Sequence, residues 1–129
     1  WRAWRCPEAG LDNLAWQKTC DNKDYTPEDD PNYGALTHQA YAAMEIEALY
    51  LWWTEQRPKR PDPMEASGWS AYCEAKWNKG GSVLDVLTND EKVDTKAMHQ
   101  IMNELDEKYA KEDEEMLIRL VKVRHALWT

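Results

Sequence analysis

Apolar residues recur at helical spacing along most of the chain, and no segment alternates apolar and polar residues as a strand does. A short helix is predicted from about Pro7 to Lys18. Pro7 suits the first position of a helix, and Leu11 and Leu14 share one of its faces. The stretch from Asp21 to Pro31, rich in Pro and Asp, is predicted to be a loop.

The next predicted helix, from Thr37 to Gln56, is apolar on nearly every side. Such a helix belongs at the centre of a bundle or in an interface. It should end near Arg57, because Pro58 disfavours helical geometry in the residue before it. Glu45 and Glu47 lie nearly opposite each other around its axis, so at least one of them should point inward.

A third helix is predicted from Asp62 to Asn78. Asp62 and Pro63 have the order of an N-cap and a first helical residue, and Glu65 follows Asp62 at capping-box spacing. Gly68 lies inside this segment and costs about 1 kcal/mol relative to Ala, which indicates a kink or the close approach of another backbone.

The longest predicted helix begins at Asp94 or Thr95 and runs close to the end of the chain, after a short helix at about residues 83–87. Its apolar seam recurs in steps of four and three, and only Glu112 interrupts it. The seam consists of Met98, Met102, Leu105, Tyr109, Glu112, Met116, Leu120, Val123 and Leu127.

These elements predict an all-α protein, a small helical bundle with two long helices and two or three short ones. The 129 residues fit a single helical domain over 1–129. Eight Trp and six Tyr, with no Phe, indicate that large aromatic side chains fill much of the core. No apolar run approaches the roughly 20 residues that span a bilayer, so no membrane association is expected.

Net charge narrows the choice of partners. The formal charge is −8, from 24 acidic and 16 basic side chains, which argues against direct binding to a DNA backbone. Residues 90–115 hold ten acids and four bases, a net −6, and could dock on a basic surface. The odd count of three cysteines, Cys6, Cys20 and Cys73, favours reduced thiols in a cytoplasmic protein. The alternative is a Cys6–Cys20 disulfide in a secreted protein, which would leave Cys73 without a partner.

One short segment is cationic, with Arg57, Lys59 and Arg60 in four residues. It leads into a predicted helix N-terminus and is framed by tryptophans, so it could hold a phosphate beside a stacked base, or a partner's carboxylates. The candidate ligand- or partner-binding residues are Trp53, Arg57, Lys59, Arg60, Ser67 and Trp69. In that role, Arg60→Glu would weaken binding with little loss of stability. The alternative is a rigid turn in which Arg57 and Arg60 pair with the protein's own acids.

Carboxylates on the two long helices offer a second possible chemistry. Glu45, Glu104 and Glu107 could bind Mg²⁺, as paired acids do in all-α nucleotide pyrophosphohydrolases, although their spacing is only loosely similar. The alternative is solvated helix faces. No nucleophile is paired with a base at a recognisable spacing, which favours a protein that is not an enzyme.

Two segments, Glu115–Thr129 and the block from Leu51-Trp52-Trp53 to Ala71-Tyr72-Cys73, resemble small helical proteins encoded by tailed bacteriophages. The resemblance implies a phage setting, action in the cytoplasm of an infected cell and Thr129 as the natural C-terminus. It carries over no catalytic residue.

The leading hypothesis is a non-enzymatic, phage-type accessory protein without a cofactor that binds another macromolecule, for example as an inhibitor of a host factor. A protein partner is expected, and homo-oligomers remain open. The alternative is a nucleotide-binding protein or a Mg²⁺-dependent pyrophosphohydrolase. It would use the cationic segment for the ligand and Glu45, Glu104 and Glu107 for the metal.

Overall fold

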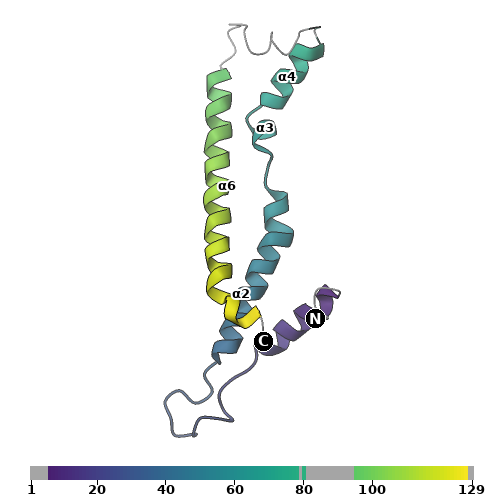
Figure 1. Cartoon of the computed structure of the whole chain (residues 1–129). Helices are drawn as coiled ribbons and strands as arrows, with labels where there is room; N and C mark the ends of the chain where they lie inside the picture. Colours follow the sequence, from purple (N-terminus) through teal and green to yellow (C-terminus); the bar gives the residue numbers. More distant parts are fainter. Residues whose placement is uncertain (1–5, 79, 81–94, 128–129) are drawn as a thin grey trace. The chain divides into compact units, whose positions relative to one another are not determined.

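The computed structural model of the chain describes residues 6–78, 80 and 95–127. Every named element in these ranges is a helix (Figure 1), which confirms the predicted all-α class. The short helix expected at residues 83–87 lies outside the described residues. Among the helices that are described, none combines the length and apolar character that a membrane span requires.

Helix α1 spans Pro7–Gln17, close to its predicted bounds, and helix α2 spans His38–Leu51, beginning one residue after its predicted start. Pro7 occupies the start of α1, where its missing N–H costs no hydrogen bond. Thr37 caps α2, because its hydroxyl oxygen accepts a hydrogen bond from the Ala40 N–H at 3.2 Å.

The end of α2 differs from the prediction. One turn of π-helix, Trp52–Gln56, and a 3₁₀ turn, Arg57–Lys59, carry the chain past Pro58. Pro58 has no N–H to donate, and in a regular α-helix its ring would meet the carbonyl of Thr54. The wider π turn before the proline relaxes that conflict, so the helix changes its pitch instead of stopping.

The segment from Asp62 to Asn78 forms two helices, α3 at Pro63–Ala66 and α4 at Trp69–Asn78. Asp62 caps α3 as predicted, accepting hydrogen bonds from the backbone of Met64 at 2.7 Å and of Glu65 at 3.4 Å. Gly68 separates the two helices with φ +79°, and apart from its chain neighbours no atom of the described residues lies within 4 Å of where its Cβ would stand. Gly68 is therefore required for its backbone conformation and not for the close approach of another backbone.

Helix α6 spans Thr95–Val123 and ends in the 3₁₀ turn η3, Arg124–Leu127. Its predicted seam is confirmed from Met98 to Val123, since all eight of these positions are at least half-buried. Leu127 is exposed, because the 3₁₀ turn has a different period and rotates it away from the seam.

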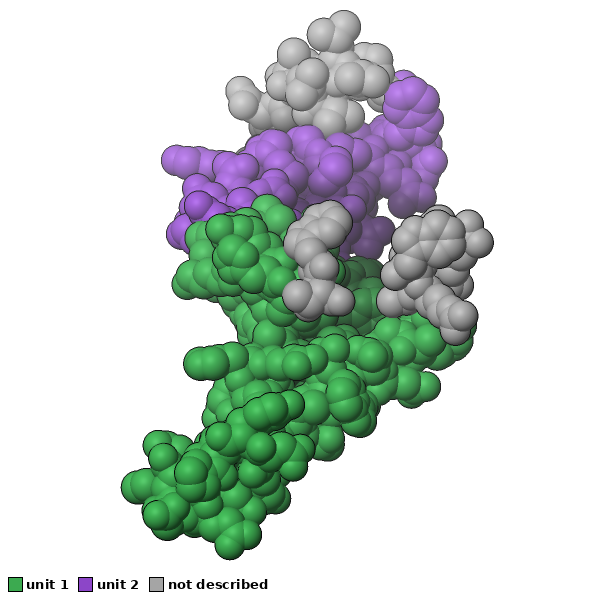
Figure 2. Space-filling model, turned by 60° about the horizontal axis from the view of Figure 1, so that its bottom comes forward, with its two compact units in different colours: residues 1–58, 115–129 green, residues 59–114 purple. Residues whose placement is uncertain are grey.

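The chain divides into two compact units (Figure 2), residues 1–58 with 115–129 as unit 1 and residues 59–114 as unit 2. Unit 1 contains α1, α2 and the C-terminal end of α6. Its core is small: the buried apolar side chains among the described residues are Ala40, Ala43, Leu49 and Trp52. The single domain expected over 1–129 stays a prediction, because α6 belongs to both units.

A substitution at Gly68 tests the break between α3 and α4. Gly68→Ala should lower the free energy of unfolding by about 1–2 kcal/mol, because an L side chain is strained at this positive φ. Gly68→Asn should cost less, since Asn adopts the left-handed region more readily. Urea unfolding followed by circular dichroism measures both, and an Ala variant as stable as the wild type would contradict this account.

Candidate functional site

The six predicted binding residues do not fall in one unit. Trp53 and Arg57 belong to unit 1, whereas Lys59, Arg60, Ser67 and Trp69 belong to unit 2. Each group is described in its own unit, and a ligand-binding role for the set stays a prediction.

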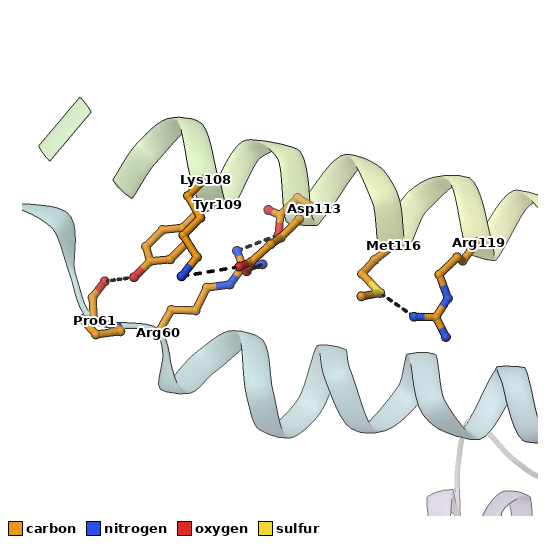
Figure 3. Close-up of polar contacts among 8 residues, drawn as sticks. Arg60, Pro61, Lys108, Tyr109, Asp113, Met116 and Arg119 are labelled. Carbon is orange, nitrogen blue, oxygen red and sulfur yellow. Dashed lines mark hydrogen bonds and ion pairs between the residues drawn. The ribbon is translucent and has the colours of Figure 1, made fainter. Parts of the chain in front are cut away.

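In unit 2, Arg60 is engaged by α6 (Figure 3). Its Nη1 donates to Asp113 Oδ1 at 2.8 Å, and its Nη2 lies 2.9 Å from Glu112 Oε2. The guanidinium also stands over the Tyr109 ring, 4.8 Å from its centroid, while the Tyr109 hydroxyl donates to the Pro61 carbonyl at 3.0 Å. With a side chain only 14% exposed, Arg60 is a structural cation.

The Arg60 contacts explain the one interruption of the α6 seam. Glu112 stands at a position where every neighbour in the seam except Tyr109 is fully apolar, and it faces Arg60. A half-buried carboxylate is stabilised only if a cation meets it there. This pairing was predictable from the sequence in part, because an acidic residue within an apolar seam indicates that a basic residue packs against it from a neighbouring element. For Arg60, the structure thus agrees with the alternative interpretation of the cationic segment, a rigid turn whose arginines pair with the protein's own acids.

In unit 1, Arg57 stands over the Trp53 ring, 4.9 Å from its centroid. Trp53 in turn meets Trp52 edge to face, with ring centroids 4.8 Å apart. The Trp53 indole N–H is buried and has no hydrogen-bond acceptor among the described residues. This cluster holds the π turn together through aromatic and cation–π contacts.

Ser67 and Trp69 lie at the junction of α3 and α4. Ser67 is buried; its hydroxyl donates to the Met64 carbonyl at 3.2 Å, and its oxygen accepts from the Trp69 N–H at 3.4 Å. The Trp69 ring packs against His99 of α6 in a tilted arrangement, with centroids 4.3 Å apart and an interplanar angle of 45°. Both residues therefore serve the internal packing of unit 2.

The acids of the metal hypothesis are separated by unit. Glu45 is in unit 1, and Glu104 and Glu107 are in unit 2, where Glu104 accepts a hydrogen bond from Gln100 and both acids are exposed. No group of three or more His, Cys, Asp or Glu side chains that could hold a metal ion occurs among residues 6–78, 80 and 95–127. The Mg²⁺ alternative gains no assembled site from the geometry.

Glu45 and Glu47 instead connect α2 to two other helices of unit 1. Arg119 of α6 binds Glu45 through two hydrogen bonds, from Nε at 2.6 Å and from Nη2 at 2.9 Å. Lys18, the residue that follows α1, binds both oxygens of Glu47 at 2.7 and 2.6 Å. The Arg119 guanidinium lowers the pKa of the Glu45 carboxyl below its ordinary value, although burial acts in the opposite direction.

An apolar stripe on α2 remains exposed beside these ion pairs. It consists of Tyr41, Met44, Ala48 and Leu51, called here the α2 stripe, and the exposed fractions of Tyr41, Met44 and Leu51 are 58%, 37% and 36%. Steps of three, four and three place these residues on one face of the helix. The sequence indicated that this helix is apolar on nearly every side, but it did not show which side its neighbours leave open.

Comparison with known proteins adds no family to this geometry. No protein-family model matches the chain, and no curated protein or solved structure is significantly similar to it.

Substitution of Arg60 tests its structural role. Arg60→Glu should lower the free energy of unfolding by about 2 kcal/mol, because Glu112 and Asp113 lose their cation and gain a third negative charge. This revises the expectation of little loss of stability. Lys59→Glu makes the same charge change at an exposed position and should stay within about 0.5 kcal/mol of the wild type. Equal effects in chemical denaturation would refute the assignment.

The Glu45–Arg119 pair predicts a pH dependence. Because the pKa of Glu45 is lowered in the folded state, the pair stabilises the protein above the ordinary carboxyl value of 4.5 and loses this effect as pH falls through the folded-state pKa. Glu45→Gln should cost about 0.5–1 kcal/mol near neutral pH and almost nothing in acid.

The control for this prediction is the same substitution in an Arg119→Met background, where its cost should not vary with pH. Urea unfolding near pH 7 and near pH 3 measures both. A cost of Glu45→Gln that is unchanged in acid would mean that the ion pair does not stabilise the fold.

Proposed function

We propose that this chain is a non-enzymatic protein that binds another protein through the α2 stripe. The observation that supports the proposal is the exposed row of Tyr41, Met44, Ala48 and Leu51. Exposed apolar side chains that are contiguous on one face, in a protein with a small core, are typical of interaction surfaces. The phage setting and the inhibition of a host factor rest on the sequence resemblance alone.

The borders of the stripe support this reading. On a helix that turns by about 100° per residue, Glu45 and Glu47 flank the stripe on its two sides. Arg119 and Lys18 hold these acids in place. An apolar centre with a polar rim is the usual anatomy of a protein interface.

The dimensions of the stripe favour a helical partner. Tyr41 and Leu51 are ten residues apart, which corresponds to about 15 Å along the axis. A row of this length fits three or four apolar side chains spaced at i, i+3 or i+4, and i+7 on a second helix. Basic residues beside those anchors would complement Glu55, which lies exposed on the same face one turn after Leu51.

The residue types in the stripe are also typical of protein interfaces. Tyr and Met are enriched in interface centres, because they combine a large contact area with adaptable packing. Tyr41, the most exposed of the three large side chains in the stripe, is the expected anchor, and its hydroxyl can keep a polar contact at the rim.

The experiment compares capture of partners by three immobilised proteins. The wild type should retain a defined protein from a bacterial lysate, and the variant Met44→Glu with Leu51→Glu should retain it at least about tenfold more weakly. Tyr25→Ser, which removes an exposed aromatic outside the stripe, should bind as the wild type does.

Circular dichroism checks that the three proteins are equally folded, as expected for exposed positions. Equal capture by the stripe variant, or recovery of no other protein at any salt concentration, would contradict the proposal.

A further inference from the structure

A second exposed apolar surface lies on the C-terminal third of α6. Leu117, Ile118 and Val121 are 49%, 47% and 57% exposed, and they are adjacent on the helix at spacings of one, three and four. These three residues are called here the α6 patch. All of them belong to unit 1.

The α6 patch faces away from the packed side of its helix. Met116, Arg119, Leu120 and Val123 are half-buried, and Arg119 reaches α2 through Glu45. With about 100° per residue, the patch is centred on roughly the opposite side of the helix from these four. No helix of unit 1 whose contacts are described covers it, so its apolar area is open to a partner.

Exposed charges of opposite sign stand at the two ends of the patch. Glu115 precedes it, and Lys122 and Arg124 follow. Glu115 forms no ion pair with any described residue. Lys122 forms none either, although its charge helps Arg119 to lower the pKa of Glu45. Arg124 donates to the Val121 carbonyl at 2.8 Å, which anchors its side chain beside the patch. The surface is thus negative at one end, apolar in the middle and positive at the other end.

We infer that the α6 patch is a contact between two copies of this chain, in which the two α6 helices run antiparallel across a two-fold axis. In that arrangement the patch meets itself, and Glu115 of each copy lies toward Lys122 and Arg124 of the other. In a parallel arrangement like charges would meet. The charge order therefore selects a second copy as the occupant, in one orientation.

The small size of the patch sets the expected strength. Two helices that cross over one or two turns bury less than the roughly 1,200 Å² of a standard interface. The dimer should therefore be weak, and its population should rise with protein concentration. Sedimentation velocity of the purified protein, from low micromolar to near-millimolar concentration, measures it without any other partner.

Three variants test the contact. Val121→Asp should raise the dimer dissociation constant at least about tenfold, because it places two charges in the apolar centre. Glu115→Lys should raise it about three- to tenfold, since each substitution acts twice in a two-fold dimer. The charge-swapped variant, Glu115→Lys with Lys122→Glu, should recover part of this loss, because Lys122→Glu supplies a new opposite charge while Arg124 stays positive.

Two controls separate this contact from other surfaces. Ile101→Asp changes a comparably exposed apolar residue on another face of α6, and Met44→Glu with Leu51→Glu changes the α2 stripe. Both should leave the dissociation constant unchanged, so the dimer and the proposed partner site can fail independently. A wild type that is monomeric throughout, a dimer insensitive to Val121→Asp, or a charge swap that restores nothing would overturn the inference.

Discussion

Glu45 and Glu47 project from nearly opposite sides of α2, and the arrangement of unit 1 depends on the two cations that meet them. Lys18 binds one acid from the end of α1, and Arg119 binds the other from α6. The described residues of this unit contribute four buried apolar side chains, which are too few to orient three helices by shape alone. Two charge-assisted contacts on opposite sides of one helix supply the missing specificity, because each is satisfied in only one register.

Ion pairs also connect the elements of unit 2, where Arg60 contacts Glu112 and Asp113. The segment with the most cations for its length thus uses its least exposed cation to satisfy acids of α6. The aromatic residues near this segment also make internal contacts: Trp53 packs against Arg57, and Trp69 packs against His99. Arginine and tryptophan side chains can bind a phosphate and a base, but they can equally hold packed helices together. The contacts described here support the second, structural role.

With these groups engaged internally, the exposed apolar surfaces of unit 1 are the features that support the proposed binding function. The α2 stripe and the α6 patch lie on different helices of unit 1, and each is bordered by charge. The stripe is flanked by acids that are already paired, which suits a partner whose main contribution is apolar. The patch ends in charges of opposite sign with no described ion pair at Glu115 or Lys122, which suits a copy of itself. Charge at the borders, more than apolar area, distinguishes the two surfaces.

The sequence by itself determined the local structure. Helix starts at Pro7, Thr37 and Asp62 and the α6 seam depend on hydrogen bonds, steric limits and periodicity within a few residues. The single helix predicted from Asp62 to Asn78 was wrong, because the positive φ of Gly68 divides this segment into α3 and α4. The tertiary structure alone decided which charges meet. Arg60 and Asp113 are 53 residues apart, and Glu45 and Arg119 are 74 apart. Several acids and bases could pair equally well by type, and only the packing of helices selects among them, since an ion pair depends on distance and register and not on spacing along the chain.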